Sequence, residues 1–321
     1  MSDKPVILAH PGLGGLIAPF QGAYEVVTWP KTPEQSAVFL RETAGRVTAA
    51  VVIGSTGLPP EAYEALPNLK AICAFGAGVD GVDAAQCRAR GIAVGNCPAA
   101  NAEDVADFAV GLLLDVERRL SLGDRLLRSG GWKGIPAFPV PPRGMKGLKT
   151  GVVGLGAIGE AAARRLAAFG CDIRWTGPRP KPDKPWTYDS DLIALARWSD
   201  ALLLTLRPDP GTERMINAEI LEALGPEGVL INVARGSVVD EDALIAALRE
   251  GRLGGAGLDV FESEPTPAER WADVPNAILT PHIAGASRQS VMTMVMMVLA
   301  NLAAVYEGRP MPTPVLLPQP L

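Results

Sequence analysis

Three side chains that can handle a proton or hold an anion each follow a short apolar run in the second half of the chain. Arg235 follows GVLINVA, Glu264 comes soon after GAGLDVF, and His282 ends AILTPH. Histidine titrates near neutral pH and is a common proton donor, and arginine orients polar substrates. A lone histidine is more often structural, but three such residues at strand ends favour a site. Together they supply the proton donor, the orienting cation and the tuning carboxylate that reduction of a carbonyl group needs.

A glycine-rich turn, GVVGLGAIGE at residues 151–160, stands between a predicted strand and a predicted helix. In a dinucleotide-binding turn the first glycine allows a tight bend, the second lets the backbone approach a pyrophosphate, and the third allows close helix packing. The helix N-terminus then faces the phosphates. A tight turn without a ligand is the plain alternative, but the second strand, CDIRW, favours a nucleotide site. The predicted cofactor-binding residues of this turn are Gly154, Gly156, Ala157, Ile158 and Gly159.

The loop after that second strand indicates which dinucleotide binds. An NAD site places an acidic residue about 20 residues after the glycine turn, where it binds the ribose hydroxyl groups. Here WTGPRPKPDK has no acid before Asp183, and Arg179 and Lys181 stand near the position of a 2′-phosphate. Arg207, in TLRPDPGT, adds a cation on the adenine side. We therefore expect NADP(H), with NAD(H) as the alternative cofactor. The non-functional explanation is that all three cations are solvated charges on loops.

Two sets of short apolar runs, separated by helix-like segments, predict two α/β units. One long amphipathic helix is expected over residues 101–130, and the Gly- and Pro-rich stretch that follows, as far as residue 147, is expected to be loop. The apolar segment 287–308 is expected to form one helix that packs back on the N-terminal unit. Strands are expected at residues 6–10, 49–55, 69–75, 91–96, 148–156, 171–177, 200–206, 228–234, 255–261 and 277–282.

The predicted fold class is therefore α/β, with two Rossmann-like or flavodoxin-like domains, each a doubly wound parallel sheet, and a cleft between them. An outer domain is expected over residues 1–98 plus 287–321. A dinucleotide-binding Rossmann domain is expected over residues 99–286, inserted between the two pieces of the outer domain.

The composition is that of a globular protein, with 48% hydrophobic and 20% charged residues in 321. A formal charge of −5 provides no basic surface for nucleic acid. The N-terminal residues make a poor signal peptide, and VMTMVMMVLANLAAV contains Asn301 and is shorter than the ~20 residues that span a membrane. The four cysteines show no CxxC spacing and no nearby histidines. We therefore expect a cytoplasmic enzyme with no metal, no nucleic acid partner and no membrane partner.

Four stretches resemble one family, the D-isomer-specific 2-hydroxyacid dehydrogenases: GVVGLGAIG, LINVARGSVVDEDALIAAL, GAGLDVFESEP and LTPHIAGAS. The order and the separations of Arg235, Glu264 and His282 are also similar to those of the family. The resemblance implies that His282 is the acid/base and that Glu264 holds its imidazole and favours its charged form. It implies that Arg235 binds the substrate carboxylate and polarises the keto oxygen.

The resemblance implies further roles. The outer domain would bind substrate, and AFGAGVDGVD, residues 74–83, resembles the loop whose backbone N–H groups take the substrate carboxylate, which places Ala77 and Gly78 there. The stretch 117–145 would be a dimerisation arm, so a homodimer is expected. Asp259 matches the family position that contacts the nicotinamide carboxamide. The predicted cofactor residues outside the glycine turn are Arg179, Lys181, Arg207, Thr212, Ala234 and Asp259.

Within the family, AEDVADFAVGLLL, ALGPEGVLINVARG and WTGPRPKP look most like glyoxylate/hydroxypyruvate and hydroxyphenylpyruvate reductases. The resemblance implies an oxidoreductase that reduces a small 2-keto acid to the D-2-hydroxy acid, with NADPH as hydride donor. Two alternatives stay open from the sequence. One is a non-catalytic NAD(P)H-binding scaffold, because corepressors share this fold and triad. The other is a reductase for larger 2-keto acids, aryl or phosphorylated.

Overall fold

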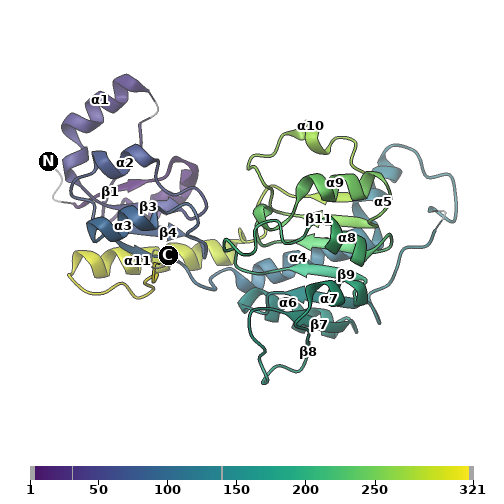
Figure 1. Ribbon diagram of the computed structural model, residues 1–321. Coiled ribbons are helices and arrows are strands. Elements are labelled where there is room, and N and C mark those ends of the chain that lie inside the picture. Colours follow the sequence, from purple (N-terminus) through teal and green to yellow (C-terminus); the bar gives the residue numbers. More distant parts are fainter. Residues whose placement is uncertain (1–3, 31, 139, 318–321) are drawn as a thin grey trace. The chain divides into compact units, whose positions relative to one another are not determined.

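The chain folds into two compact units, each with its own parallel sheet and cores (Figure 1). The structure is a computed structural model that describes residues 4–30, 32–138 and 140–317. The terminal unit comprises residues 1–101 and 286–321, and the central unit comprises residues 102–285. The sequence places its domain boundaries after residues 98 and 286, beside these divisions. The functional roles given to the two domains stay predictions.

The terminal unit is built on a five-stranded sheet whose order is β2-β1-β3-β4-β5, with every pair parallel. Apolar side chains leave both faces of its strands. In β1, Val6 and Leu8 enter one core, while Ile7 and Ala9 enter the other. Such two-sided burial explains why these strands read as continuous apolar runs. The strands are β1 Val6–Ala9, β2 Glu25–Thr28, β3 Val47–Ile53, β4 Ala71–Phe75 and β5 Ala93–Gly95.

Helices cover both faces of this sheet (Figure 1). Side chains of α1, α2 and α3 contribute to one core, and side chains of η1 and α11 contribute to the other. The expectation that the last helix packs on the N-terminal unit is therefore confirmed. The helices are η1 Pro11–Phe20, α1 Pro33–Glu42, η2 Ala44–Arg46, α2 Pro60–Ala65, α3 Ala84–Arg90 and α11 Arg288–Tyr306.

Helix α11 is longer than the apolar stretch noted in the sequence. Its 19 residues are long and apolar enough to cross a membrane by length and composition alone, contrary to the expectation that this segment is too short. In the folded chain, however, Val298 and Leu302 are buried in the core of the terminal unit. Asn301 is also buried, and its Nδ2 donates a hydrogen bond to Thr313 Oγ1 at 2.7 Å. The contacts are those of a core helix.

The central unit is built on a seven-stranded, all-parallel sheet whose order is β12-β11-β10-β9-β6-β7-β8. The chain starts at β6, runs outward to β8, then returns to β9 on the other side of β6. The switch point of this doubly wound sheet therefore lies between β6 and β9, where such folds bind ligands. The strands are β6 Lys149–Val153, β7 Asp172–Thr176, β8 Thr187–Tyr188, β9 Ala201–Leu204, β10 Val229–Asn232, β11 Gly255–Leu258 and β12 Ala277–Leu279.

Helices α4 and α6 lie on one face of this sheet, and α7, α8 and α9 lie on the other (Figure 1). The alternation is visible in β9, where Leu202 and Leu204 enter one core and Ala201 and Leu203 enter the other. The helices are α4 Ala102–Arg118, α5 Leu120–Arg128, α6 Ala157–Ala168, α7 Leu192–Trp198, α8 Ala218–Leu224, η3 Gly236–Val238, α9 Glu241–Arg249 and α10 Ala268–Trp271.

The single long helix expected over residues 101–130 is wrong in one respect, because it is broken into α4 and α5. Arg119 has a φ of 57°, which lies in the left-handed region and ends α4. Beyond it, the backbone N–H of Ser121 donates to Asp115 Oδ1 at 2.7 Å and its hydroxyl bonds to Oδ2. Asp115 thus accepts a hydrogen bond from a backbone N–H in the first turn of α5 that has no partner within the helix. The amphipathic pattern alone does not indicate this second helix start.

Candidate active site

The glycine turn joins β6 to α6 and brings backbone into unusually close contact. Gly154 has a φ of +94°, and a Cβ on it would lie 2.5 Å from the Cα of Leu206. A Cβ on Gly159 would lie 2.1 Å from the carbonyl oxygen of Gly154, which also accepts a 2.7 Å hydrogen bond from Thr205 Oγ1. Side chains are therefore excluded at these two positions by the packing of the turn itself.

Gly156 is different, because a Cβ there would meet no atom within 4 Å among the described residues. It is the N-cap residue of the 12-residue helix α6, which begins at Ala157 and continues through Ile158. As a glycine, it has no side chain with which to cap the N-terminus of the helix. A pyrophosphate needs open space next to backbone N–H groups that have no partner within the helix, and it is favoured by the positive end of the helix dipole. Both conditions are met beside Gly156. The turn therefore fits the phosphate groups of a dinucleotide.

The cations predicted for the 2′-phosphate lie on loops beside this turn. Lys181, after β7, donates a hydrogen bond from Nζ to the carbonyl oxygen of Leu155 at 2.6 Å, so it is tied directly to the glycine turn. Arg179 is exposed on the same loop, and Arg207 is exposed after β9. Thr212 uses its hydroxyl within its own turn, where it accepts from the N–H of Asp209 at 2.8 Å. Of Arg179, Lys181 and Arg207, Lys181 is thus the one that hydrogen-bonds to the glycine turn in the described part of the chain.

A histidine–carboxylate pair lies beyond β11 and β12, at their carboxyl ends. His282 Nδ1 and Glu264 Oε2 are 2.6 Å apart, and Glu264 Oε1 accepts a hydrogen bond from the N–H of Phe261 at 3.0 Å. About a third of each side chain is exposed, 37% for His282 and 32% for Glu264. Because Nδ1 is bound to the carboxylate, Nε2 is the ring atom that can face a substrate.

The charge state of Glu264 follows from its neighbours. Burial raises the pKa of its carboxyl, but the hydrogen bonds from His282 and from the Phe261 N–H, with the charges of His282 and Arg235, outweigh burial and hold the pKa below its usual value. Glu264 is therefore ionised at neutral pH and can accept a hydrogen bond from His282 Nδ1. Arg235, the third predicted residue, is near enough for its charge to act on Glu264.

The backbone of His282 is held by a buried aspartate. His282 has a φ of 53°, a left-handed conformation that costs energy for a residue with a side chain and is common at functional sites. Asp259 is 1% exposed, and its carbonyl oxygen accepts from the His282 N–H at 2.9 Å. Its carboxylate accepts from the N–H groups of Ile283 and Ala284 and from the hydroxyl of Thr280. The structure shows Asp259 as a clamp on the histidine loop, a role that sequence reasoning missed; contact with a carboxamide stays a prediction.

Arg235 is positioned in a similar way after β10. Asn232, at the end of that strand, accepts from the N–H of Ala234 at 3.0 Å and donates from Nδ2 to the carbonyl oxygen of Arg235 at 2.9 Å. The next residue, Gly236, touches the loop that carries Glu264, because a Cβ on it would lie 1.8 Å from the carbonyl carbon of Phe261. Backbone packing therefore fixes the loop of Arg235 against the loop of Glu264.

A cavity of about 680 Å³ opens beside the histidine–carboxylate pair in the central unit. Its walls are mainly apolar, which lowers the local dielectric constant and strengthens charge interactions at its edge. The residues that line it are Phe261, Glu264, Pro265, Thr266, Ala268, Trp271, Ala272, Leu279, Thr280, Pro281 and His282.

In the terminal unit, the predicted carboxylate loop follows β4. It begins at Gly76, which has a φ of +128°, and continues through Ala77 and Gly78. Asn96 Nδ2 donates to the carbonyl oxygen of Ala77 at 2.6 Å. Among the residues that the structure describes, the N–H groups of Ala77 and Gly78 donate to no protein acceptor. These two donors are therefore available to an anion.

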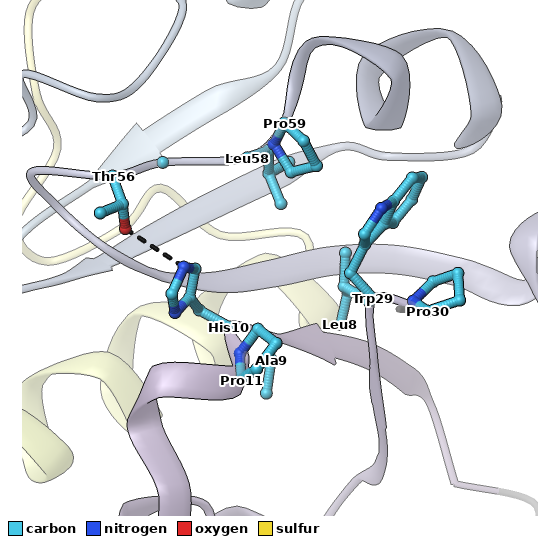
Figure 2. A pocket seen from close by; sticks show the side chains of 10 residues that line it. Leu8, Ala9, His10, Pro11, Trp29, Pro30, Thr56, Leu58 and Pro59 are labelled. Carbon is cyan, nitrogen blue, oxygen red and sulfur yellow. Dashed lines mark hydrogen bonds between the residues drawn. The ribbon is translucent and has the colours of Figure 1, made fainter. Parts of the chain in front are cut away.

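A second pocket, of about 330 Å³, lies at the carboxyl ends of β1, β2 and β3 (Figure 2). Its walls include Trp29 and Leu58, and its polar edge is the bond between His10 Nε2 and Thr56 Oγ1, 3.2 Å long. His10 Nδ1 accepts from the N–H of Gly12 at 3.0 Å, and burial lowers the pKa of His10. Both ring nitrogens of His10 are thus engaged within the fold, whereas His282 keeps one nitrogen for chemistry.

Comparison with known proteins decides the family. The family model described as "D-isomer specific 2-hydroxyacid dehydrogenase, NAD binding domain" matches residues 110–284. The chain is 41% identical to hydroxyphenylpyruvate reductase of Plectranthus scutellarioides over 86% of its length and 88% of that protein's. The chain belongs to the D-isomer-specific 2-hydroxyacid dehydrogenase family.

Two more relatives cover the chain almost completely. Glyoxylate/hydroxypyruvate reductase A of Arabidopsis thaliana is 39% identical over 98% of the chain and 100% of that protein. The crystal structure of an NADPH-dependent glyoxylate/hydroxypyruvate reductase of Sinorhizobium meliloti, in complex with NADP and malonate, is 38% identical, with a TM-score of 0.87. It covers 99% of this chain and 100% of that one.

These findings confirm the family, the α/β fold class and an NAD(P) cofactor for this dehydrogenase. They support a 2-keto acid reductase, and neither the non-catalytic scaffold nor a reductase specialised for larger acids is favoured. The roles of individual residues rest on the geometry described above. They stay predictions, as do the homodimer and the cytoplasmic location.

Proposed function

We propose that this dehydrogenase reduces a small 2-keto acid of the glyoxylate or hydroxypyruvate type to the D-2-hydroxy acid, with NADPH as hydride donor. The observation that supports this most is the 2.6 Å pair of His282 and Glu264 beside Arg235, at the carboxyl end of a sheet whose glycine turn fits a dinucleotide. A bound nicotinamide supplies the hydride. The residues of the chain must then bind the acid, protonate its oxygen and stabilise the developing charge.

His282 acts as the proton donor in this proposal. Glu264 orients the ring through Nδ1, which leaves Nε2 to give a proton to the carbonyl oxygen of the substrate. Arg235 lies near the same oxygen and stabilises the negative charge that forms there. The free N–H groups of Ala77 and Gly78 bind the substrate carboxylate. These are the roles that the resemblance implies, now supported by geometry within each unit.

Cofactor selection is the second part of the proposal. Gly156, Ala157 and Ile158 would hold the pyrophosphate at the N-terminus of α6. Lys181 would stand beside the 2′-phosphate, because its ammonium already lies on the glycine turn at Leu155. Arg179, on the same loop, would bind that phosphate through two N–H groups of its planar guanidinium.

Initial rates with glyoxylate or hydroxypyruvate and NADPH test the function. The wild type should turn over, and His282→Ala should reduce kcat by ~10²-fold or more while NADPH still binds. The matched control is His10→Ala, because His10 lies in the other pocket and both of its ring nitrogens are hydrogen-bonded within the fold. A wild type that binds NADPH but reduces neither acid would refute the reductase function. It would favour the alternative that the chain is a non-catalytic NAD(P)H-binding scaffold. Equal turnover by His282→Ala would refute the assignment of the proton donor.

We also propose that the chain is a cytoplasmic homodimer. Residues 117–145 present apolar side chains to solvent, and Ile135 is 92% exposed. Trp132 and Val140 are exposed on the same arm. Several exposed apolar side chains on one segment are best explained by a partner surface. Light scattering should give twice the chain mass, and Trp132→Ser with Ile135→Ser should shift the chain toward monomer; a wild-type monomer at micromolar concentration would contradict the proposal.

A further inference from the structure

A buried acid that the chemistry described so far does not use lies at the start of α9. Glu241 is only 3% exposed, although it is charged and stands in the first turn of a helix. Its Oε2 accepts a hydrogen bond from Arg270 Nε, in α10, at 3.0 Å. Its Oε1 accepts from the backbone N–H of Glu262. An ionised group is costly to bury unless its partners are placed well, so this arrangement needs a reason.

The backbone held by Glu241 carries the catalytic carboxylate. Glu262 is the residue after Phe261, whose N–H binds Glu264 Oε1 at 3.0 Å. The loop 261–264 thus donates two backbone hydrogen bonds: the N–H of Glu262 donates to Glu241, and the N–H of Phe261 donates to the loop's own carboxylate, Glu264. The same stretch is pressed against Gly236, beside Arg235. Any movement of Glu262 is therefore passed to Glu264, and through the 2.6 Å bond to His282.

We infer that Glu241 and Arg270 form a positioning pair, which fixes the loop 261–264 so that Glu264 meets His282 Nδ1 and lies beside Arg235. This inference rests on the proposed function of the same site. Neither residue reaches the predicted reacting atoms; both act through the backbone of Glu262. The pair spans two segments, α9 and α10, that flank the loop on the chain, so it ties both ends of the catalytic turn to the body of the unit.

A purely structural ion pair is the competing explanation, and a neighbour of the pair separates the two. Asp242 also binds Arg270, with Oδ1 2.9 Å from the guanidinium, but its side chain is 77% exposed. Only Glu241 joins Arg270 to the loop backbone; Asp242 has no bond to it among the described residues. Asp242→Asn therefore removes a charge from the same arginine without touching the loop, and it is the matched control.

Kinetics of the full-length enzyme with NADPH and glyoxylate form the first test. Glu241→Gln keeps the size and one oxygen acceptor but loses the charge that holds Arg270. We expect kcat to fall about tenfold, because sub-ångström displacement of a catalytic group is enough for such a loss, while the KM for NADPH stays unchanged. Arg270→Gln should give the same loss, Arg270→Lys should restore most of the activity, and Asp242→Asn should match the wild type.

The second test does not depend on turnover. The chain has two histidines, so imidazole-labelled protein gives NMR signals for His10 and His282 alone. Glu241→Gln should move the His282 signals and leave those of His10, in the terminal unit, in place. Signals of His282 that coincide with the wild type, or a variant with lowered melting temperature but unchanged kcat, would overturn the inference and leave a structural ion pair. Should the wild type lack turnover, the proposed function fails, but the NMR comparison still decides whether Glu241 positions the pair.

Discussion

The contact between Gly236 and the loop of Glu264 gives the sharpest single perturbation. A Cβ at residue 236 would lie 1.8 Å from the carbonyl carbon and 2.0 Å from the carbonyl oxygen of Phe261, and 2.2 Å from the nitrogen of Glu262. Real Cβ atoms essentially never come closer than 3.0 Å to another heavy atom. All three neighbours are backbone atoms, so no side-chain rotation relieves the clash. Gly236→Ala must therefore push the two loops apart by more than 1 Å.

That displacement separates Arg235 from the loop that carries Glu264. A misplacement of ~1 Å at a catalytic group costs about 10²-fold in rate, which corresponds to roughly 2.7 kcal/mol of transition-state stabilisation. We expect kcat/KM for glyoxylate to fall by about that factor in Gly236→Ala. NADPH affinity should change much less, because the glycine turn at Gly156 lies after a different strand.

Steady-state rates, NADPH titration and thermal melting of the same preparations provide the measurement. Gly111→Ala is the matched control: it makes the same substitution in the interior of α4, where a Cβ meets no atom within 4 Å among the described residues. It should leave the rates unchanged and stabilise the fold by roughly 0.5–1 kcal/mol, as alanine does in a helix. A folded Gly236→Ala enzyme with kcat/KM within about twofold of the wild type would refute the argument that this contact sets the geometry of the site.

Three further predictions concern the cofactor site and the dyad. Gly156→Ala should weaken NADPH binding without changing stability, because its Cβ fills only open space, whereas Gly159→Ala should destabilise the fold by about 1–3 kcal/mol through its 2.1 Å contact. Fluorescence titration measures the affinity and thermal melting the stability; unchanged NADPH affinity in Gly156→Ala would show that the turn holds no phosphate. Arg179→Ala should raise the KM for NADPH by about tenfold, the worth of one charge-assisted hydrogen bond, and leave that for NADH unchanged; an unaltered cofactor ratio would remove Arg179 from the 2′-phosphate site. The pKa of Glu264 is lowered in the folded chain, so the stability that its charge contributes is present above pH 4.5 and lost as the pH falls through the lowered pKa. The difference in free energy of unfolding between the wild type and Glu264→Gln should therefore shrink below pH 4.5. Urea titrations that show a constant difference from pH 7 to pH 3 would contradict the lowered pKa of Glu264.

Strands buried on both faces were the easiest elements to predict. β3 and β9 carry side chains that enter two cores, so they read as unbroken apolar runs. β2 was missed because it is the edge strand, short and only partly buried, with Glu25 at its start. The break at Arg119 was missed because Asp115 and Ser121 fit an amphipathic helix as well as they fit a cap. Local periodicity does not distinguish the two.

The chemistry-bearing residues could be predicted because their type, order and position after strands are visible in the chain. The residues that hold them could not. Glu241 reads as an ordinary acid in the first turn of a helix, and Arg270 as a solvated charge before a tryptophan. Only their placement across the loop from Glu264 shows their connection. Lys181 was predicted beside a phosphate, but its bond to the carbonyl oxygen of Leu155 depends on how the loop folds back.

One physical pattern connects the three catalytic positions. Each lies after a strand on a partly exposed loop, and each loop is anchored by a polar side chain that is almost completely buried: Asn232 for Arg235, Asp259 for His282 and Glu241 for Glu264. Burying a polar group is unfavourable unless it is fully hydrogen-bonded, so an apolar residue would serve better if only stability mattered. Backbone N–H and C=O groups on irregular loops, however, have no ladder partner and need one. These buried anchors supply it, and they turn loops that would otherwise move into fixed supports for groups that must remain open to substrate.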